Sequence, residues 1–122
     1  MKKCVKLIAA ASVIATLGAC TGVAVNAEET TVKAGFIFLH DENSTYDLNF
    51  INAAKAACEK MGIEYVAKTG IPEGQEAYEA ACELADAGCN FVFADSFGHE
   101  DYIIEAAREF PDVQFCHATG TK

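Results

Sequence analysis

Residues 32–47 read VKAGFIFLHDENSTYD and join an apolar run to a polar cluster. The run from Val32 to Leu39 has the length and aromatic content of a strand, and the polar residues 40–44 follow it directly. Further along, apolar residues recur at the three- and four-residue spacing of one helix face, namely at Leu48, Ile51, Ala54, Cys58 and Met61. This stretch therefore predicts a strand, a polar loop and a helix.

A nearly continuous apolar strand that leads into a helix is typical of a parallel sheet buried on both faces. In open α/β sheets, ligands bind in the crevice outside the carboxyl ends of the strands. The loop at residues 39–47 follows such an end. It is therefore the first candidate for a binding site.

The rest of the sequence repeats the alternation of strand and helix. Strands are expected at 63–69, 90–94 and 113–118, and helices at 75–87 and 100–110. The helix positions expected to face the core are Tyr78, Ala81, Cys82, Ala85, Tyr102, Ile103, Ala106 and Phe110. The order β-α-β-α-β-α-β predicts an α/β fold, a parallel three-layer sandwich with right-handed crossovers. Because no helix follows the last strand, we expect one sheet face to be partly uncovered and the fold to be incomplete.

The first 31 residues have the features of an export signal. Lys2, Lys3 and Lys6 precede the apolar residues 7–19, which is the pattern of a secretory signal peptide and is too short for a membrane span. Residues 17–20 (LGAC) fit a bacterial lipobox in which Cys20 becomes lipidated. Cleavage after Ala27 is the alternative. We therefore expect a signal peptide at 1–19, a tether at 20–31 and the folded part at 32–122, outside the cytoplasm.

The chain is acidic and contains four cysteines beyond residue 20. Its net charge is −9, and it becomes −12 once the three lysines of the signal peptide are removed, which argues against nucleic acid as a partner. In an exported protein the four thiols could form disulfides. However, no CxxC spacing occurs, and the surrounding sequence favours small buried apolar side chains. A disulfide that involves Cys89 remains the alternative for the set Cys58, Cys82, Cys89 and Cys116.

Several segments resemble one known family. They are KAGFIFLHDENSTYDLNF, IPEG, FVFADSFGHED and EFPDVQFCHATGTK, which follow the lipobox. Together they resemble the beginning of the basic membrane protein family, which comprises substrate-binding lipoproteins of ABC importers, several of them purine nucleoside receptors. The resemblance implies a type I periplasmic-binding-protein lobe, of which this chain would be an N-terminal part.

The same resemblance implies a function and a set of partners. It implies an extracytoplasmic, lipid-anchored protein at the cell membrane that binds a small ligand, such as a purine nucleoside, and delivers it to ABC permease subunits. No enzymatic activity and no cofactor are expected. A chain that matches only part of one lobe would lack half of the binding cleft.

The residues that match the family's ligand-binding segments come from two loops. The resemblance implies that Tyr46 stacks on a nucleobase and that Asp47 is its polar partner. Packing at the helix start is the alternative for Tyr46, and capping of the helix is the alternative for Asp47. Ser44 and Thr45 are expected to be caps. The full set of expected ligand-binding residues is Tyr46, Asp47, Asp41, Ser96, Phe97 and Gly98.

The histidines leave two alternatives open. His40 and His99 each precede two acidic residues at the ends of strands, so an exported metal-binding or hydrolytic α/β domain is the alternative function. No HxH, HxxxH or G-x-S-x-G pattern supports it, and we expect no metal. We expect His40 and His99 at the rim of the cleft and His117 near the core. A phospho-acceptor domain with Asp41, Asp95 and Thr119 is disfavoured by the export signal.

Overall fold

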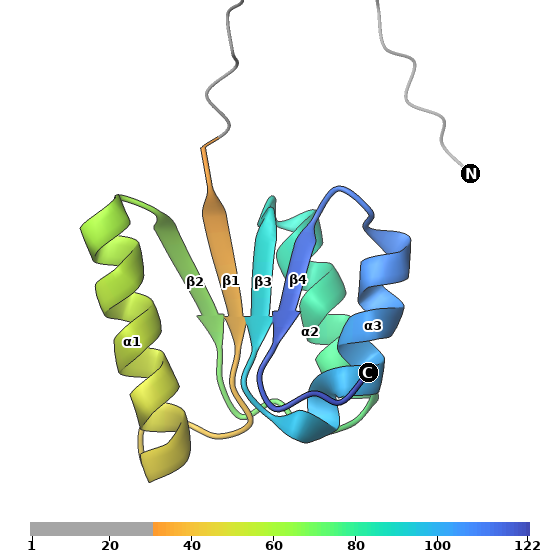
Figure 1. Ribbon diagram of the computed structural model, residues 1–122, viewed down its shortest axis with the longest axis horizontal. Helices are drawn as coiled ribbons and strands as arrows, with labels where there is room; N and C mark the ends of the chain where they lie inside the picture. Colours follow the sequence, from red (N-terminus) through yellow and green to blue (C-terminus); the bar gives the residue numbers. More distant parts are fainter. Residues whose placement is uncertain (1–30) are drawn as a thin grey trace, which may run out of the picture.

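The computed structural model describes residues 31–122. It contains a four-stranded parallel sheet in the order β2-β1-β3-β4, with helices on both faces, so the predicted α/β class is confirmed (Figure 1). The elements are β1 (Lys33–Ile37), α1 (Thr45–Met61), β2 (Glu64–Lys68), α2 (Gln75–Asp86), β3 (Phe91–Ala94), η1 (Phe97–His99), α3 (Glu100–Glu109) and β4 (Gln114–His117). The expected signal peptide, the tether and Cys20 lie outside the described residues.

The crossovers place α1 alone on one face of the sheet and α2 with α3 on the other (Figure 1). The chain leaves β1 in one direction to reach β2, and it then crosses back over β1 to reach β3. Right-handed crossovers that run in opposite directions put their helices on opposite faces. The order of the strands therefore reverses between β1 and β3, and the loops that follow these two strands lead to helices on opposite faces of the sheet.

Two apolar clusters flank the sheet. The first lies on the α1 side and includes Ala34, Phe36, Phe38 and Ile51. The second lies on the side of α2 and α3 and contains Ile37, Ala80, Ala81, Leu84, Cys89, Val92, Ala94, Ile103 and Ala106. Alternate residues of β1 belong to opposite clusters, as the two-residue period of a strand requires.

Alpha-helix α2 lies very close to β1 at Gly35. An ideal Cβ at Gly35 would lie 3.0 Å from Leu84 Cδ1 and 3.2 Å from Cys89 Sγ. The absence of a side chain at Gly35 thus makes room for Leu84, which is buried.

The buried faces of the helices differ in part from those expected. On α2 the buried residues are Ala77, Ala80, Ala81 and Leu84, whereas Tyr78, Cys82 and Ala85 are only partly buried. On α3, Ile103 and Ala106 are buried as expected, but Tyr102 is only partly buried, as is Phe110 directly after the helix. Met61, at the end of α1, is 63% exposed. Because α2 packs closely on the sheet, most of its buried side chains are alanines, and larger side chains lie at the edges of the contact.

The sheet face on the α1 side is only partly covered. Phe91 and Phe93 of β3 are half-buried there, beside an apolar hollow of about 300 Å³ that Val32, Met61 and Phe91 help to line. One helix spans β1 and β2 on this face, whereas two helices cover the opposite face. The expected partial exposure of one sheet face is therefore present.

The four cysteines of the described part of the chain are all free thiols. Cys58 and Cys89 are buried, as small apolar side chains would be, and Cys82 and Cys116 are partly buried. Within the same part of the chain, no helix has the length and apolar character needed to cross a membrane.

Candidate ligand-binding site

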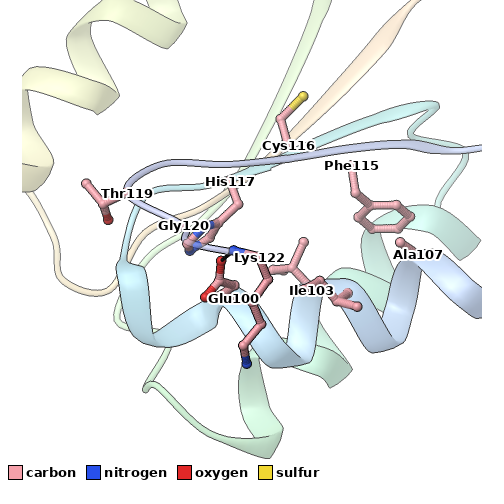
Figure 2. Close-up of a pocket in the computed structure, with 10 residues that line it drawn as sticks. Glu100, Ile103, Ala107, Phe115, Cys116, His117, Thr119, Gly120 and Lys122 are labelled. Carbon is pink, nitrogen blue, oxygen red and sulfur yellow. Dashed lines mark hydrogen bonds between the residues drawn. The ribbon is translucent and has the colours of Figure 1, made fainter.

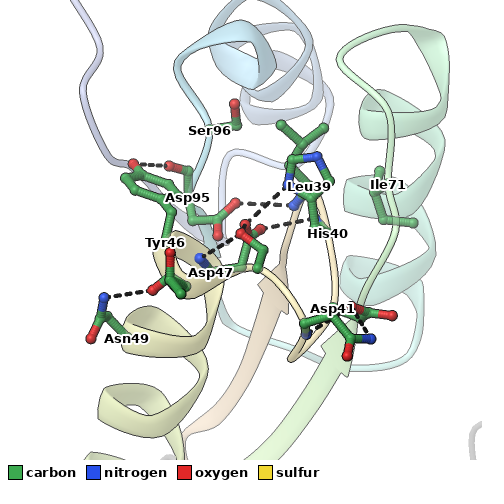
Figure 3. A network of polar contacts seen from close by, with 12 residues as sticks. Leu39, His40, Asp41, Tyr46, Asp47, Asn49, Ile71, Asp95 and Ser96 are labelled. Atoms are coloured by element: carbon green, nitrogen blue, oxygen red, sulfur yellow. Dashed lines mark hydrogen bonds and ion pairs between the residues drawn. The ribbon is translucent and has the colours of Figure 1, made fainter.

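The loops after β1 and β3 meet at the carboxyl edge of the sheet. The Tyr46 hydroxyl, in the first turn of α1, donates a hydrogen bond of 2.9 Å to the backbone carbonyl of Asp95, directly after β3 (Figure 3). The Leu39 amide donates to Asp95 Oδ1 over 3.1 Å. These two bonds bring the two predicted site segments together across the reversal in strand order, where open α/β sheets bind ligands.

Two aromatic side chains are exposed at this edge. Tyr46 is 47% exposed and Phe97, in η1, is 68% exposed. The hydroxyl of Tyr46 is held by Asp95, and its ring packs on Phe50 with the ring centroids 5.1 Å apart. The Tyr46 ring is therefore fixed in position while part of it faces solvent, as a stacking surface for a planar ligand requires.

Asp47 lies in the first turn of α1, where Ser44 is the N-cap. The helix begins at Thr45, earlier than the periodicity indicated, so Tyr46 and Asp47 are helical residues. The Asp47 amide donates to Ser44 Oγ, and the Ser44 hydroxyl donates in return to the Asp47 carboxylate. This reciprocal pairing resembles a capping box. The Asp47 side chain is fully buried, and its contacts are those of the capping alternative.

The charge of Asp47 is stabilised by hydrogen bonds. Burial acts to raise its pKa, but bonds from the Ser44 hydroxyl, the His40 amide and the His40 ring outweigh burial and lower the pKa to about 2. The His40 amide lies 2.8 Å from Asp47 Oδ1, and His40 Nδ1 lies 3.1 Å from Oδ2. Asp47 is therefore anionic at neutral pH.

The environment of Asp95 favours its protonated form, whereas that of Asp47 favours the ionised form. Its side chain is fully buried, and Oδ2 has no hydrogen-bond partner within the described residues. Burial raises its pKa to about 7; the Leu39 amide opposes this shift, and the neighbouring Asp47 carboxylate adds to it. Asp95 therefore retains its proton up to about pH 7, whereas the neighbouring Asp47 is ionised.

The remaining predicted residues mostly contact the protein itself. Asp41 is exposed, and its Oδ1 accepts from the backbone and side-chain nitrogens of Asn43, which lowers the pKa of Asp41. Ser96 is 6% exposed and donates to Glu73. The Gly98 amide, expected to be available to a ligand oxygen, donates to Glu73 Oε1 over 3.2 Å.

Glu73 is a residue of this edge that the sequence did not indicate. It lies in the loop after β2, and its carboxylate takes the position near η1 that an anionic ligand group would occupy. An ideal Cβ at Gly98 would lie within contact distance of that carboxylate, so Gly98 allows Glu73 to approach closely. An exposed glutamate in a turn carries no signal for such a contact in the sequence.

The histidines occupy different environments from one another. His40 is at the rim, with 60% of its side chain exposed, as expected. His99 is fully buried rather than at the rim; its Nε2 bonds the Ile71 carbonyl at 2.9 Å, and burial lowers its pKa. His117 is partly buried and bonds the Ser96 carbonyl. Within residues 31–122, no group of three or more His, Cys, Asp or Glu side chains is placed to hold a metal ion.

A separate hollow of about 380 Å³ lies between α3 and the segment that follows β4 (Figure 2). Its walls include Ile103, Phe115, His117 and Lys122. Glu100 accepts from the backbone amides of Thr121 and Lys122 at its edge. None of the six predicted ligand-binding residues lines this hollow, so it is distinct from the site at the ends of β1 and β3.

The chain is similar to a binding protein along most of its own length. It is 38% identical over 116 residues to a purine-binding protein of Brucella abortus (strain 2308), which covers 90% of this chain and 32% of that protein. The chain therefore spans about a third of the length of this relative. No family model matches it.

Two solved structures share the fold. An ABC transporter solute-binding protein from Conexibacter woesei DSM 14684 superposes with a TM-score of 0.61 and 22% identity, over 69% of this chain and 28% of that chain. A transcriptional activator of the comK gene from Bacillus halodurans superposes with a TM-score of 0.64 and 20% identity, over 72% and 30%. At these identities the likeness shows the fold alone.

These findings agree with the resemblance that the sequence suggested. The Brucella abortus relative is named as a binding protein. The chain is similar in sequence, along most of its length, to part of a purine-binding protein, and it shares the fold of part of a solute-binding protein.

Proposed function

We propose that this chain is part of an extracytoplasmic substrate-binding component of an ABC importer, and that its ligand is a purine nucleoside. The observation that carries the proposal is Tyr46, a fixed and half-exposed aromatic ring at the reversal in strand order. The similarity to a purine-binding protein supports the ligand class, because a purine offers the flat surface that such a ring can stack against.

The other residues of this edge have two roles in the proposal. Phe97 offers a second exposed aromatic surface, and Asp41 offers an exposed carboxylate to a ligand donor. Ser96, Gly98 and Asp47 hold the loops in place through their bonds to Glu73, Ser44 and His40. The ligand would therefore contact the aromatic rings and the exposed polar groups.

The proposed location and partners rest on the N-terminal sequence. The lipobox at residues 17–20 supports a lipid anchor at Cys20 on the outer face of the cell membrane, with cleavage after Ala27 and secretion as the alternative. An ABC permease is the proposed partner, on the basis of the similarity to a solute-binding protein. Metabolic labelling with a radioactive fatty acid, with and without Cys20→Ala, tests the anchor.

The ligand is tested by isothermal titration of inosine, guanosine and adenosine into the purified chain. The same titration is made with a second protein, in which this chain is extended to the length of the Brucella abortus relative. Tyr46→Phe keeps the ring and removes the hydroxyl, whereas Tyr46→Leu removes the flat surface at similar volume. We expect Tyr46→Leu to bind at least about tenfold more weakly than Tyr46→Phe, because base stacking contributes about 1–3 kcal/mol.

Two outcomes would contradict the proposal. Equal affinities of Tyr46→Leu and Tyr46→Phe would show that Tyr46 is not the stacking surface. If none of the three nucleosides bound to either form of the protein, although both were folded, the nucleoside assignment would be wrong. The shared fold would then be the extent of the likeness to binding proteins.

A further inference from the structure

We propose that His40 is a ligand-contacting residue of this site and that buried Asp47 is the residue that orients it. This inference rests on the proposed function, because it assigns a further contact in the same site. It also specifies the ligand, which must present an N–H or O–H donor to the outward nitrogen of His40. The hydrogen bonds of His40 and the exposure of its ring support this assignment.

His40 is exposed, yet it is held on three sides. Its backbone amide donates to Asp47 Oδ1 over 2.8 Å, and its carbonyl accepts from the Gly70 amide over 3.3 Å. Its ring Nδ1 lies 3.1 Å from Asp47 Oδ2. An exposed surface histidine ordinarily samples several rotamers, and ordering it has an entropic cost. Here the loop, the helix cap and a buried carboxylate all restrain this residue (Figure 3).

The partner of Nδ1 determines which ring nitrogen carries the proton. An ionised carboxylate only accepts hydrogen bonds, so a bond between Asp47 and Nδ1 requires that Nδ1 carry the hydrogen. In the neutral imidazole Nε2 is then an acceptor. Asp47 stays ionised because Ser44 and His40 donate to it. The pair therefore presents one acceptor atom of defined direction.

That acceptor has no partner within the part of the chain that the structure describes. No hydrogen bond to His40 Nε2 occurs among residues 31–122, and 60% of the His40 side chain is exposed. His40 lies three residues after the end of β1, in the loop at the carboxyl edge where Tyr46 and Asp95 meet. A ligand that stacks on Tyr46 and carries a donor on its edge would find an oriented acceptor there, which a flat aromatic surface alone cannot provide.

The test compares two substitutions of His40 that keep different halves of the imidazole. His40→Asn places an amide near the position of Nδ1 and can still donate to Asp47, but it has no group at Nε2. His40→Gln reaches the position of Nε2 with an acceptor oxygen and gives up the bond to Asp47. If His40 contacts the ligand, His40→Asn should bind inosine roughly five- to tenfold more weakly, and His40→Gln should recover part of that loss.

Two further measurements identify the donor and the tautomer. Titrations with 1-methylinosine, which lacks the N1 hydrogen, and with hypoxanthine, which lacks the ribose, show which ligand group His40 serves. The analogue that lacks the contacted group should bind the unaltered chain more weakly than inosine does. This difference between the analogue and inosine should vanish in His40→Asn. The ¹⁵N chemical shifts of His40 in the free chain should show hydrogen on Nδ1, and inosine should shift the Nε2 signal.

The possible results distinguish a failure of the His40 assignment from a failure of the proposed function. If inosine binds and perturbs Tyr46 but His40→Asn binds it as tightly as the unaltered chain, His40 is not a ligand contact and the proposed function stands. If His40→Asn binds inosine more tightly than His40→Gln does, the bond to Asp47 matters more than the acceptor at Nε2, and the role of His40 is structural. Hydrogen on Nε2 in the free chain would also overturn the proposal. If no purine binds, the proposed function fails and the assignment of His40 fails with it.

Discussion

At the scale of single residues, the most consequential feature is the pair of buried carboxyl groups at Asp47 and Asp95. Asp47 is ionised, and Asp95 keeps its proton up to about pH 7, because burial and the adjacent charge both oppose its ionisation. The folded protein thus binds a proton at Asp95 that the unfolded chain releases near pH 4. The stability contributed by this proton should fall as the pH rises from about 4 to 7.

This pH dependence should disappear when Asp95 is replaced by Asn. Between pH 5 and pH 8, we expect the free energy of unfolding of Asp95→Asn to rise relative to that of the unaltered chain by on the order of 2–3 kcal/mol, at 1.36 kcal/mol per pH unit. Urea denaturation at the two pH values measures both proteins. The difference between them is the relevant quantity, because burial lowers the pKa of His99 and contributes a slope of opposite sign.

Asp112→Asn serves as the matched control for this prediction. Asp112 is exposed in the turn before β4, so removing its charge should change stability by less than about 0.5 kcal/mol at either pH. Parallel pH profiles for Asp95→Asn and the unaltered chain would show that Asp95 is ionised throughout this range.

At the scale of elements, the contact between α2 and β1 depends on the missing side chain of Gly35. A valine there would place its Cβ about 3.0 Å from Leu84 Cδ1, and its methyl groups would crowd the buried α2 face further. We expect Gly35→Val to destabilise the chain by roughly 1–3 kcal/mol, as overpacking of a close-packed core does. Thermal unfolding followed by circular dichroism measures the change.

The same substitution at an exposed strand position should have little effect. Ala67 of β2 is exposed, and valine suits a strand, so we expect Ala67→Val to change stability by less than about 0.5 kcal/mol. If Gly35→Val were as harmless as Ala67→Val, α2 would have to be able to move away from the sheet. The close approach would then not be needed for stability.

At the scale of the whole molecule, the described sheet has two central strands and two edge strands. β1 and β3 are paired on both sides, whereas β2 and β4 each have one partner. We expect backbone amides of β1 and β3 to exchange with solvent more slowly than those of β2 and β4, because edge strands open with less loss of structure. Hydrogen–deuterium exchange by NMR measures this order, and equal protection of β4 and β1 would contradict it.

Apolar periodicity was sufficient to predict the order of the strands and helices along the chain. Residues 33–37 form a largely buried strand because a run of apolar side chains cannot remain in water, and Ser44 caps α1 because its short side chain accepts from a free amide. The same local signals indicated which loops would lie at the carboxyl edge. The resemblance of these segments to a family of binding proteins was also visible in the sequence.

The roles of individual side chains depended on contacts between segments that are distant in the chain. Tyr46 is held by Asp95, and Gly98 by Glu73. His99 is buried because Ile71 offers it a carbonyl, and the outward direction of His40 follows from the buried charge of Asp47. The local sequence pattern indicates which face of a helix or strand is apolar. It does not indicate which polar atoms come into contact when these faces pack, and those contacts determine the charges and orientations of the side chains at this site.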